Sequence, residues 1–187
     1  MAEGTHADDP GSAEVARAVS SGERGVPPPA ADEHTTLASW LDFYRTTLAM
    51  KCEGLSDDQL RTASVAPSAL TLMGLVQHET EVERNWFQRV LLGEDVPPIY
   101  GPRSAAGHDG GFEPDPAITF ETAYRTWQAE ITQSRANCAD RALDNTSPFM
   151  GGEVTLRWIY THMIAEYARH NGHADLIRER IDGITGV

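Results

Sequence analysis

Cysteine is scarce in this 187-residue sequence, which contains two, Cys52 and Cys138. They lie far apart in the chain and form neither a redox pair nor a pair of metal ligands with motif spacing. So few cysteines cannot provide the disulfide framework of a small secreted domain. The first residues (MAEGTHADDP) are polar and acidic, and they lack the apolar core of an export signal. We therefore expect a protein of the reducing cytoplasm in which both cysteines fill the core.

Positive charge is scarce too. Lys and Arg together number 15 against 28 Asp and Glu, the formal net charge is −13, and Lys51 is the only lysine. An acidic surface without a basic run repels phosphate backbones and anionic lipid headgroups. No stretch approaches the roughly 20 apolar residues that are needed to cross a bilayer. The sequence therefore predicts neither nucleic acid nor membrane as a partner.

Strand signals are also absent, because no segment alternates apolar and polar residues and no tight turn joins two β-branched runs. Instead, four segments carry apolar residues at three- and four-residue spacing, which is typical of amphipathic helices. The expected helices cover about residues 35–53, 68–92, 118–143 and 154–182. Asp32 or Thr35 is expected to cap the first helix, and Ser56 with Gln59 predicts a capping box on a short turn. Four such helices in one domain predict an all-α fold, a four-helix bundle.

The segments outside these helices differ in character. Residues 1–33 are rich in Gly, Pro, Ala and acidic residues, which predicts a flexible acidic tail before one bundle domain at residues 34–187. Residues 94–117 form a long Gly- and Pro-rich connection, and a second loop, DNTSPFMGGE, precedes the last helix. Connections as long as the first are usually functional or disordered. We expect the two loops to shape the mouth of a pocket.

The apolar face of the last helix is interrupted by polar residues. Its expected core-facing stripe reads Leu156, Ile159, Met163, Glu166, His170, His173, Ile177 and Ile181. Glu166 and His170 therefore lie one turn apart on the face directed at the core. One interpretation is an ordinary surface pair at helical spacing. A buried carboxylate, however, is costly unless a cation or strong hydrogen bonds meet it, and Arg169 and Arg178 are both expected to fall off this face.

A matching histidine, His78, interrupts the apolar stripe of the second expected helix. A lone histidine in such a place is usually a hydrogen-bonded core residue, but facing helices of a bundle also supply inward-pointing metal ligands. Two imidazoles and one carboxylate form the ligand set of a catalytic zinc site with one open position. The same set occurs at non-haem iron. We therefore interpret His78, Glu166 and His170 as candidate metal ligands, with a plain polar core as the alternative.

The residues around these positions carry a family resemblance. The segments LTLMGLVQHETEVERNWFQRVLLGED and LRWIYTHMIAEYARHNGHADLIRERIDG resemble the DinB-like superfamily, and the similarity extends over about residues 30–187. Members of this superfamily are four-helix bundles that hold a divalent metal with one His from the second helix and an H-x3-H pair from the last. His78, Glu166 and His170 match these positions, with Glu166 in place of the first His of the pair. In this respect the sequence is similar to the N-terminal domain of mycothiol-dependent maleylpyruvate isomerase, whose set is two His and one Glu.

The resemblance implies a metal-dependent enzyme that transfers a low-molecular-weight thiol such as mycothiol to an electrophilic small molecule, or a thiol-dependent isomerase. It favours Zn²⁺ as the metal and leaves Ni²⁺, Fe²⁺ and Mn²⁺ open. Three alternatives remain on the same bundle: a metal-dependent hydrolase, a non-haem iron enzyme, and a non-catalytic metal-binding stress protein. The last would use a fourth ligand from His162 or His173, because structural zinc sites are usually closed. A homodimer is compatible with a bundle, although the sequence shows no seam for one.

Three further residues are weaker candidates for the site. Arg84 either binds a substrate carboxylate or belongs to a solvated charged face together with Glu79 and Glu83. His162 and His173 either line the pocket and orient a ligand, or are an ordinary surface histidine and a packed core histidine. No catalytic group besides the metal centre itself is assigned.

Overall fold

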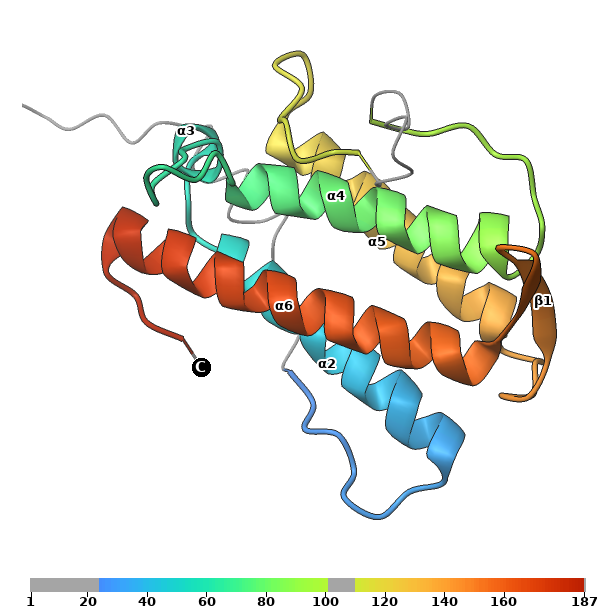
Figure 1. Ribbon diagram of the computed structural model, residues 1–187. Helices are drawn as coiled ribbons and strands as arrows, with labels where there is room; N and C mark the ends of the chain where they lie inside the picture. The colour runs from blue at the N-terminus through green and yellow to red at the C-terminus, as the bar shows by residue number, and fades with distance from the viewer. Residues whose placement is uncertain (1–23, 101–109, 187) are drawn as a thin grey trace, which may run out of the picture.

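The computed structural model describes residues 24–100 and 110–186 and shows a helical bundle with one small hairpin (Figure 1). Its elements are α2 (Glu33–Cys52), α3 (Asp57–Leu60), α4 (Leu72–Arg84), the π-helix η1 (Asn85–Val90), α5 (Phe120–Cys138), β1 (Thr146–Phe149), β2 (Gly152–Thr155) and α6 (Leu156–Asp182). The four long helices confirm the predicted all-α bundle. Most of the predicted tail, residues 1–23, lies outside the described residues.

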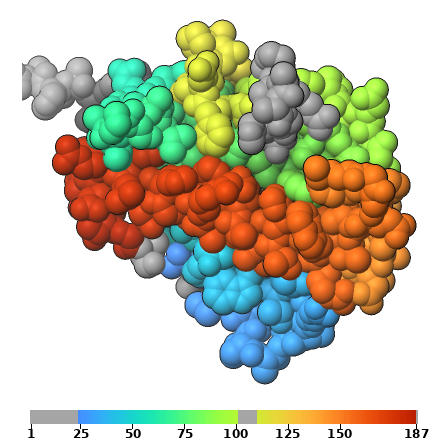
Figure 2. Space-filling view, in the orientation of Figure 1, coloured from blue at the N-terminus to red at the C-terminus, as the bar shows by residue number. Residues whose placement is uncertain are grey.

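The long helices pack as two pairs, α2 with α6 and α4 with α5, and α4 also contacts α6 and α2. Figure 2 shows α6 crossing one face of the molecule, with α2 below it. The apolar stripes of all four helices meet in one core, and burial of this surface is the main stabilising term. The largest fully buried side chains are Trp127, Tyr167, Phe87, Phe120, Leu41 and Leu48. No helix in the described parts of the chain combines the length and the hydropathy that a membrane crossing requires.

Side-chain caps set the start of the first two helices. Asp32 Oδ1 accepts a hydrogen bond from the backbone N–H of Thr35 at 3.0 Å, which makes Asp32 the N-cap of α2. Ser56 and Gln59 form the predicted capping box at the start of α3. Each cap stabilises its helix by about 1 kcal/mol because it satisfies N–H groups that the helix leaves free.

The second long helix begins later than the sequence predicts. The periodicity predicts a start near Ser68, but Thr71 is the N-cap of α4, and its Oγ1 accepts from the N–H of Gly74 at 2.9 Å. Ser68 belongs to a turn instead, with its N–H bonded to the carbonyl of Val65 at 2.8 Å. At its other end, α4 continues without a break into η1, whose wide turns are frequent at functional sites.

The third long helix is shorter than predicted. The periodicity predicts a helix as far as Leu143, but α5 ends at Cys138 and the chain turns, with the N–H of Arg141 bonded to the carbonyl of Cys138. Leu143 is nevertheless buried, because the turn directs it back into the core. The apolar pattern therefore continues beyond the end of the helix, and periodicity alone overestimates its length.

A two-stranded hairpin occupies the segment DNTSPFMGGE, where the sequence predicts a loop without strands. β1 and β2 pair antiparallel, with Phe149 opposite Gly152. Between them, Met150 (φ 49°) and Gly151 (φ 80°) both take the positive φ of a tight type I′ turn. A methionine rarely takes this conformation, and each strand has four residues. For these two reasons the sequence carries no recognisable hairpin signal.

One hydrogen-bonded chain of buried polar side chains links all four long helices. Arg45 of α2 donates to both carboxylate oxygens of Glu83 on α4 (Nε to Oε1 2.8 Å, Nη2 to Oε2 2.7 Å). Tyr167 of α6 donates its hydroxyl proton to the same carboxylate at 2.8 Å. Trp127 of α5 donates its indole N–H to the Tyr167 oxygen, also at 2.8 Å. Burial opposes the charge of Arg45, but Glu83 raises the pKa of Arg45 above its ordinary value, so Arg45 stays charged.

Replacement of Arg45 by methionine measures how strongly this chain holds the bundle. The variant leaves the Glu83 carboxylate buried without its cation, so we expect the free energy of unfolding in urea to fall by about 3–5 kcal/mol. Arg125→Met is the matched control, because Arg125 is exposed on α5 and pairs with Glu121 one turn away. The control should change the free energy of unfolding by less than about 0.5 kcal/mol. Equal effects of the two substitutions would contradict a structural role for the buried pair.

Candidate metal centre

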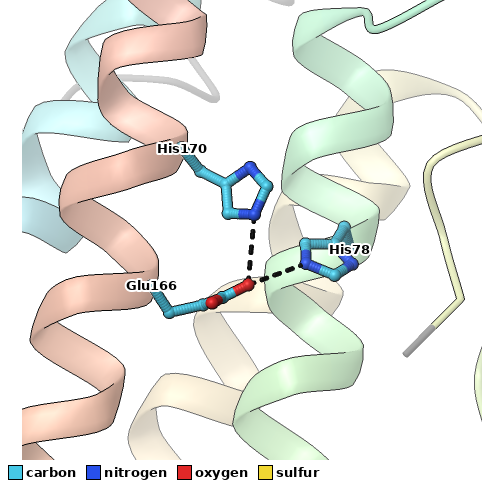
Figure 3. A group of neighbouring side chains, drawn as sticks. All are labelled: His78, Glu166 and His170. Atoms are coloured by element: carbon cyan, nitrogen blue, oxygen red, sulfur yellow. Dashed lines mark hydrogen bonds and ion pairs between the residues drawn. The ribbon is translucent and has the colours of Figure 1, made fainter. Parts of the chain in front are cut away.

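Three side chains from two helices converge between α4 and α6 (Figure 3). His78 extends from α4, whereas Glu166 and His170 extend from α6. Glu166 Oε1 lies 3.2 Å from His78 Nε2 and 3.1 Å from His170 Nε2. All three residues are buried, with exposed fractions of 5%, 8% and 4% for His78, Glu166 and His170. The structure therefore brings together the three residues that the sequence predicts as candidate ligands.

The two helices produce this arrangement through spacing and rotation. Glu166 and His170 are four residues apart, so their side chains lie one turn apart on the same face of α6. Tyr167, the neighbour of Glu166, donates its hydroxyl proton to Glu83 of α4. This bond fixes the rotation of α6 relative to α4, and the face that carries the pair is thereby directed at His78.

The separations between the candidate ligand atoms fit a small divalent cation. Metal–ligand bonds of about 2.0–2.1 Å place ligand atoms about 2.9 Å apart at octahedral angles and about 3.3 Å apart at tetrahedral angles. The observed 3.1 and 3.2 Å fall between these values, and the ligand atoms all lie within 4.8 Å of one another. Two imidazole nitrogens and a carboxylate oxygen form a donor set suited to zinc, iron and nickel. The two nitrogen–oxygen separations and the donor chemistry are therefore those of a metal site.

A hydrogen bond sets the tautomer of His78. Its Nδ1 lies 3.1 Å from the carbonyl oxygen of Gly110, which can only accept, so Nδ1 carries the proton. In the neutral ring, Nε2 then presents a lone pair to Glu166 Oε1. Two lone pairs at this distance repel each other unless a cation lies between them, and a metal ion or a proton can take that place. The orientation of His78 is thus the one that a metal-binding imidazole requires.

Electrostatics keep Glu166 ionised and His170 neutral. Burial opposes the charge of Glu166, but its contacts with His170 and His78 and the nearby charge of Arg169 hold its pKa below the ordinary value. Burial lowers the pKa of His170, although Glu166 acts in the opposite direction. An ionised carboxylate and a neutral imidazole are the protonation states that bind a metal.

The second oxygen of Glu166 pairs with an arginine that the sequence places off the core-facing side of the helix. Arg169, expected off this face, forms an ion pair with Glu166 Oε2 while 60% of its side chain remains exposed. Arg169 is exposed, as expected for a residue off this face, but its long side chain lies along the helix and reaches the Glu166 carboxylate. Arg178, also expected off the face, is buried and donates to the carbonyls of Lys51 and Glu53. Arg169 thus occupies one oxygen of Glu166 and leaves the other to the imidazoles.

The acidic residues beside His78 are buried rather than solvated. The sequence predicts a solvated charged face at Glu79, Glu83 and Arg84, but Glu79 and Glu83 are fully buried. The reason is that α4 packs against α2, α5 and α6, so these helices cover it on several sides. Burial, followed by the charges of Glu166 and Glu83, raises the pKa of Glu79 well above its ordinary value. Within the described residues, the Glu79 carboxylate has no hydrogen-bond partner.

Two of the weaker candidates have partners outside the ligand cluster. Arg84 pairs with Glu130 of α5 at 2.6 Å, on the side of α4 that faces α5. His162 stacks on Trp158, with ring centroids 5.1 Å apart and planes 5° apart, and its ring also contacts Trp86. Burial lowers the pKa of His162, so this ring is neutral at pH 7. Both side chains are therefore engaged by residues other than the candidate ligands.

The third weaker candidate, His173, contacts His170 on the side of its ring that faces away from Glu166. Its Nδ1 lies 3.3 Å from Nδ1 of His170, the ring nitrogen that does not approach Glu166. A hydrogen bond between these two nitrogens leaves His170 Nε2 free to face the cluster. His173 thus takes the position of a residue that orients a ligand.

Phe112, which the sequence analysis does not single out, completes the surroundings of His78. Its ring stacks on the His78 imidazole, with centroids 3.8 Å apart and planes 17° apart, and lies 5.6 Å from the ring of His170. Phe112 belongs to the predicted connection at residues 94–117. An isolated aromatic residue in a Gly- and Pro-rich loop was its sole signal, and it carries no periodicity that would place it.

A four-helix bundle that gathers two histidines and a glutamate between its second and last long helices defines a DinB-like protein. The sequence profile of the Mycothiol-S-transferase family matches residues 36–183, and the chain belongs to this family. Membership of the family implies mycothiol S-transferase activity. No curated protein sequence matches the chain significantly.

The two cysteines and the single lysine of the protein are withdrawn from solvent. Cys52 and Cys138 are both buried. Burial raises the pKa of Cys52 to about 12 and the pKa of Cys138 to about 11. The single lysine, Lys51, is buried as well, and its Nζ pairs with Asp175 Oδ1 at 2.6 Å. A thiol that reacts at this site therefore comes from outside the chain.

Alkylation of the cysteines checks this conclusion. At pH 8 both thiols of the folded protein stay protonated, because their pKa values lie three units or more above that pH. A free cysteine with a pKa of about 8.5 is partly thiolate under the same conditions. We expect iodoacetamide to modify the folded protein at least about 100-fold more slowly than the protein in urea, as counted by mass spectrometry. Rapid modification of either cysteine in the folded state would show that the thiols are accessible.

Proposed function

We propose that this protein transfers a low-molecular-weight thiol of the mycothiol type to an electrophilic small molecule, at a divalent metal held by His78, Glu166 and His170. The observation that carries the proposal is the approach of two histidine Nε2 atoms to one buried oxygen of Glu166, at 3.2 and 3.1 Å. The family match supports the transferase class and the identity of the thiol.

Zinc suits this ligand set best. Three protein ligands are the usual number at a catalytic zinc, where the fourth position stays free for a small ligand. Among the residues that the structure describes, neither His162 nor His173 joins the cluster as a fourth ligand, which favours a catalytic over a closed structural site. Zn²⁺ is therefore the metal that we propose, and Ni²⁺, Fe²⁺ and Mn²⁺ are the other ions to be tested.

Residues of the chain set the charge and the orientation of the proposed metal ligands. When bound, the metal lowers the pKa of a coordinated thiol and so favours the thiolate, which is the nucleophile. Glu166 contributes one negative charge, and its pKa lies low enough to keep it ionised at neutral pH. Gly110 holds His78 with the Nε2 lone pair directed inward, and Phe112 covers one face of the ring.

Metal content tests the ligand set. Protein purified without added metal should contain about one equivalent of a divalent ion, and His78→Ala, Glu166→Ala and His170→Ala should each contain less than about 0.1 equivalent by elemental analysis. His34→Ala is the matched control, because His34 packs on Tyr160 away from the cluster. The control should retain the metal of the parent protein. Near-stoichiometric metal in all three ligand variants would rule out the proposed ligands.

Thiol transfer to monobromobimane tests the reaction. The sulfur of mycothiol forms a bond to the methylene carbon of the probe, bromide leaves with its bonding electron pair, and the thiol proton passes to solvent. We expect metal-loaded protein to accelerate this step, and Glu166→Ala to lower kcat/KM by at least about 100-fold. The control His34→Ala should retain the parent value. A rate no higher than the uncatalysed one, with mycothiol and with other small thiols, would overturn the proposal.

The same preparations separate the alternative functions. Product formation from an ester or amide substrate without any thiol would indicate a hydrolase. A strict need for ferrous iron and oxygen would indicate a non-haem iron enzyme. Stoichiometric metal with no catalysis in any of these assays would indicate a metal-binding protein.

A further inference from the structure

A three-residue strap, Gly110–Phe112, lies directly on α4 at the candidate metal centre. The carbonyl oxygen of Gly110 accepts the Nδ1 proton of His78 at 3.1 Å. The ring of Phe112 stacks on the same imidazole at 3.8 Å between centroids. The first contact holds the edge of the His78 ring and the second holds its face, so that together they leave Nε2 directed at Glu166.

Two glycines allow the strap to approach the helix this closely. Gly111 has a φ of +97°, and a Cβ there would lie 2.7 Å from the backbone nitrogen of His78 and 2.7 Å from the carbonyl carbon of Gln77. Gly74 lies one turn before His78 on α4, and a Cβ there would overlap the carbonyl oxygen of Phe112. Real Cβ atoms essentially never come this close to backbone atoms. A methyl group at either position therefore displaces the strap.

The tautomer of His78 depends on the strap. With the strap in place, the Gly110 carbonyl holds a proton on Nδ1, so that a metal can replace any proton on Nε2 without leaving the ring anionic. Without the Gly110 carbonyl, the favoured neutral tautomer carries its proton on Nε2, because Glu166 Oε1 lies 3.2 Å away and accepts it. That proton occupies the direction from which a metal would bind. Displacement of the strap therefore leaves His78 in a tautomer that cannot bind a metal through Nε2.

We propose that the strap is the positioning element of the metal site, so that its seating on α4 and metal binding through His78 are coupled. This inference rests on the metal centre proposed above. The strap acts through the imidazole and does not touch the metal. By linkage, the factor by which the seated strap strengthens metal binding equals the factor by which metal strengthens seating of the strap.

The first test compares two glycines of positive φ. Gly111→Ala and Gly93→Ala both place a methyl group on a left-handed backbone, but a Cβ at Gly93 meets nothing within 4 Å. Both variants carry the strain of a positive φ, whereas Gly111→Ala also displaces the strap. In competition with a chelator, we expect Gly111→Ala to bind Zn²⁺ about 10–100-fold more weakly than the parent, and Gly93→Ala to stay within about threefold.

A second pair uses two glycines inside helices, where alanine is the better helix former. Gly74→Ala places a methyl group under the strap, whereas a Cβ at Gly172 of α6 meets nothing within 4 Å. Gly74→Ala should weaken Zn²⁺ binding by about 10–100-fold, and Gly172→Ala should bind like the parent. Helical circular dichroism of both variants should match the parent, so that a loss of affinity is not a loss of fold.

A readout without metal follows the histidine directly. In metal-free parent protein, ¹⁵N NMR should show a proton on His78 Nδ1, and in Gly111→Ala this Nδ1 proton should be lost, with Nε2 alone protonated. In the parent, addition of Zn²⁺ should slow hydrogen exchange of the amides of Gly111 and Phe112. The variant His170→Ala should lose this protection.

These measurements separate the two proposals. A parent protein that binds no Zn²⁺ would overturn the metal centre and, with it, the coupling. If Gly111→Ala and Gly74→Ala bind Zn²⁺ as tightly as the parent does, and the His78 tautomer is unchanged, the role of the strap is overturned. The metal centre then remains intact.

Discussion

The hydrogen-bonded chain from Arg45 through Glu83 and Tyr167 to Trp127 sets how the four long helices face one another. Apolar side chains tolerate several packings of similar volume, so a leucine-rich core alone leaves helix rotation weakly defined. A buried charge and its donors are different, because any helix that rotates away leaves an unpaired group in the core. One member of the chain comes from each long helix. These hydrogen bonds therefore fix the rotation of the helices relative to one another, which apolar packing alone would not do.

The candidate metal centre depends on this rotation. Glu83 lies five residues beyond His78 on α4, and Tyr167 follows Glu166 on α6, so the bond between Glu83 and Tyr167 lies next to the cluster in both helices. A small rotation of either helix would separate the Nε2 atoms of His78 and His170 from their shared oxygen. The polar residues that appear misplaced on the apolar stripes thus form two adjacent layers. One layer is satisfied by its own hydrogen bonds, and the other is the layer at which we propose a metal.

The sequence predicts the helices and the meeting of His78, Glu166 and His170, because periodicity reports which face of a helix is buried. It cannot predict contacts that depend on a long side chain or on the path of a loop. The ion pair of Arg169 follows from side-chain reach, and the stacking of Phe112 follows from a loop conformation. The hairpin was missed for a related reason, since its turn is made by a residue type that seldom adopts positive φ. The helix ends that were wrong lie where apolar residues continue beyond the last turn or precede the first.

The withdrawal of Cys52, Cys138 and Lys51 from solvent has a consequence for the durability of such an enzyme. An enzyme with the proposed activity on electrophiles would be exposed to alkylation by its own substrates, and thiols and amines are the side chains that react first. This chain has two thiols and one lysine amine, and all three are buried in the bundle. The protein therefore presents these electrophiles with no accessible cysteine or lysine of its own. For the transfer reaction proposed above, this packing would protect the protein from alkylation by its own substrate.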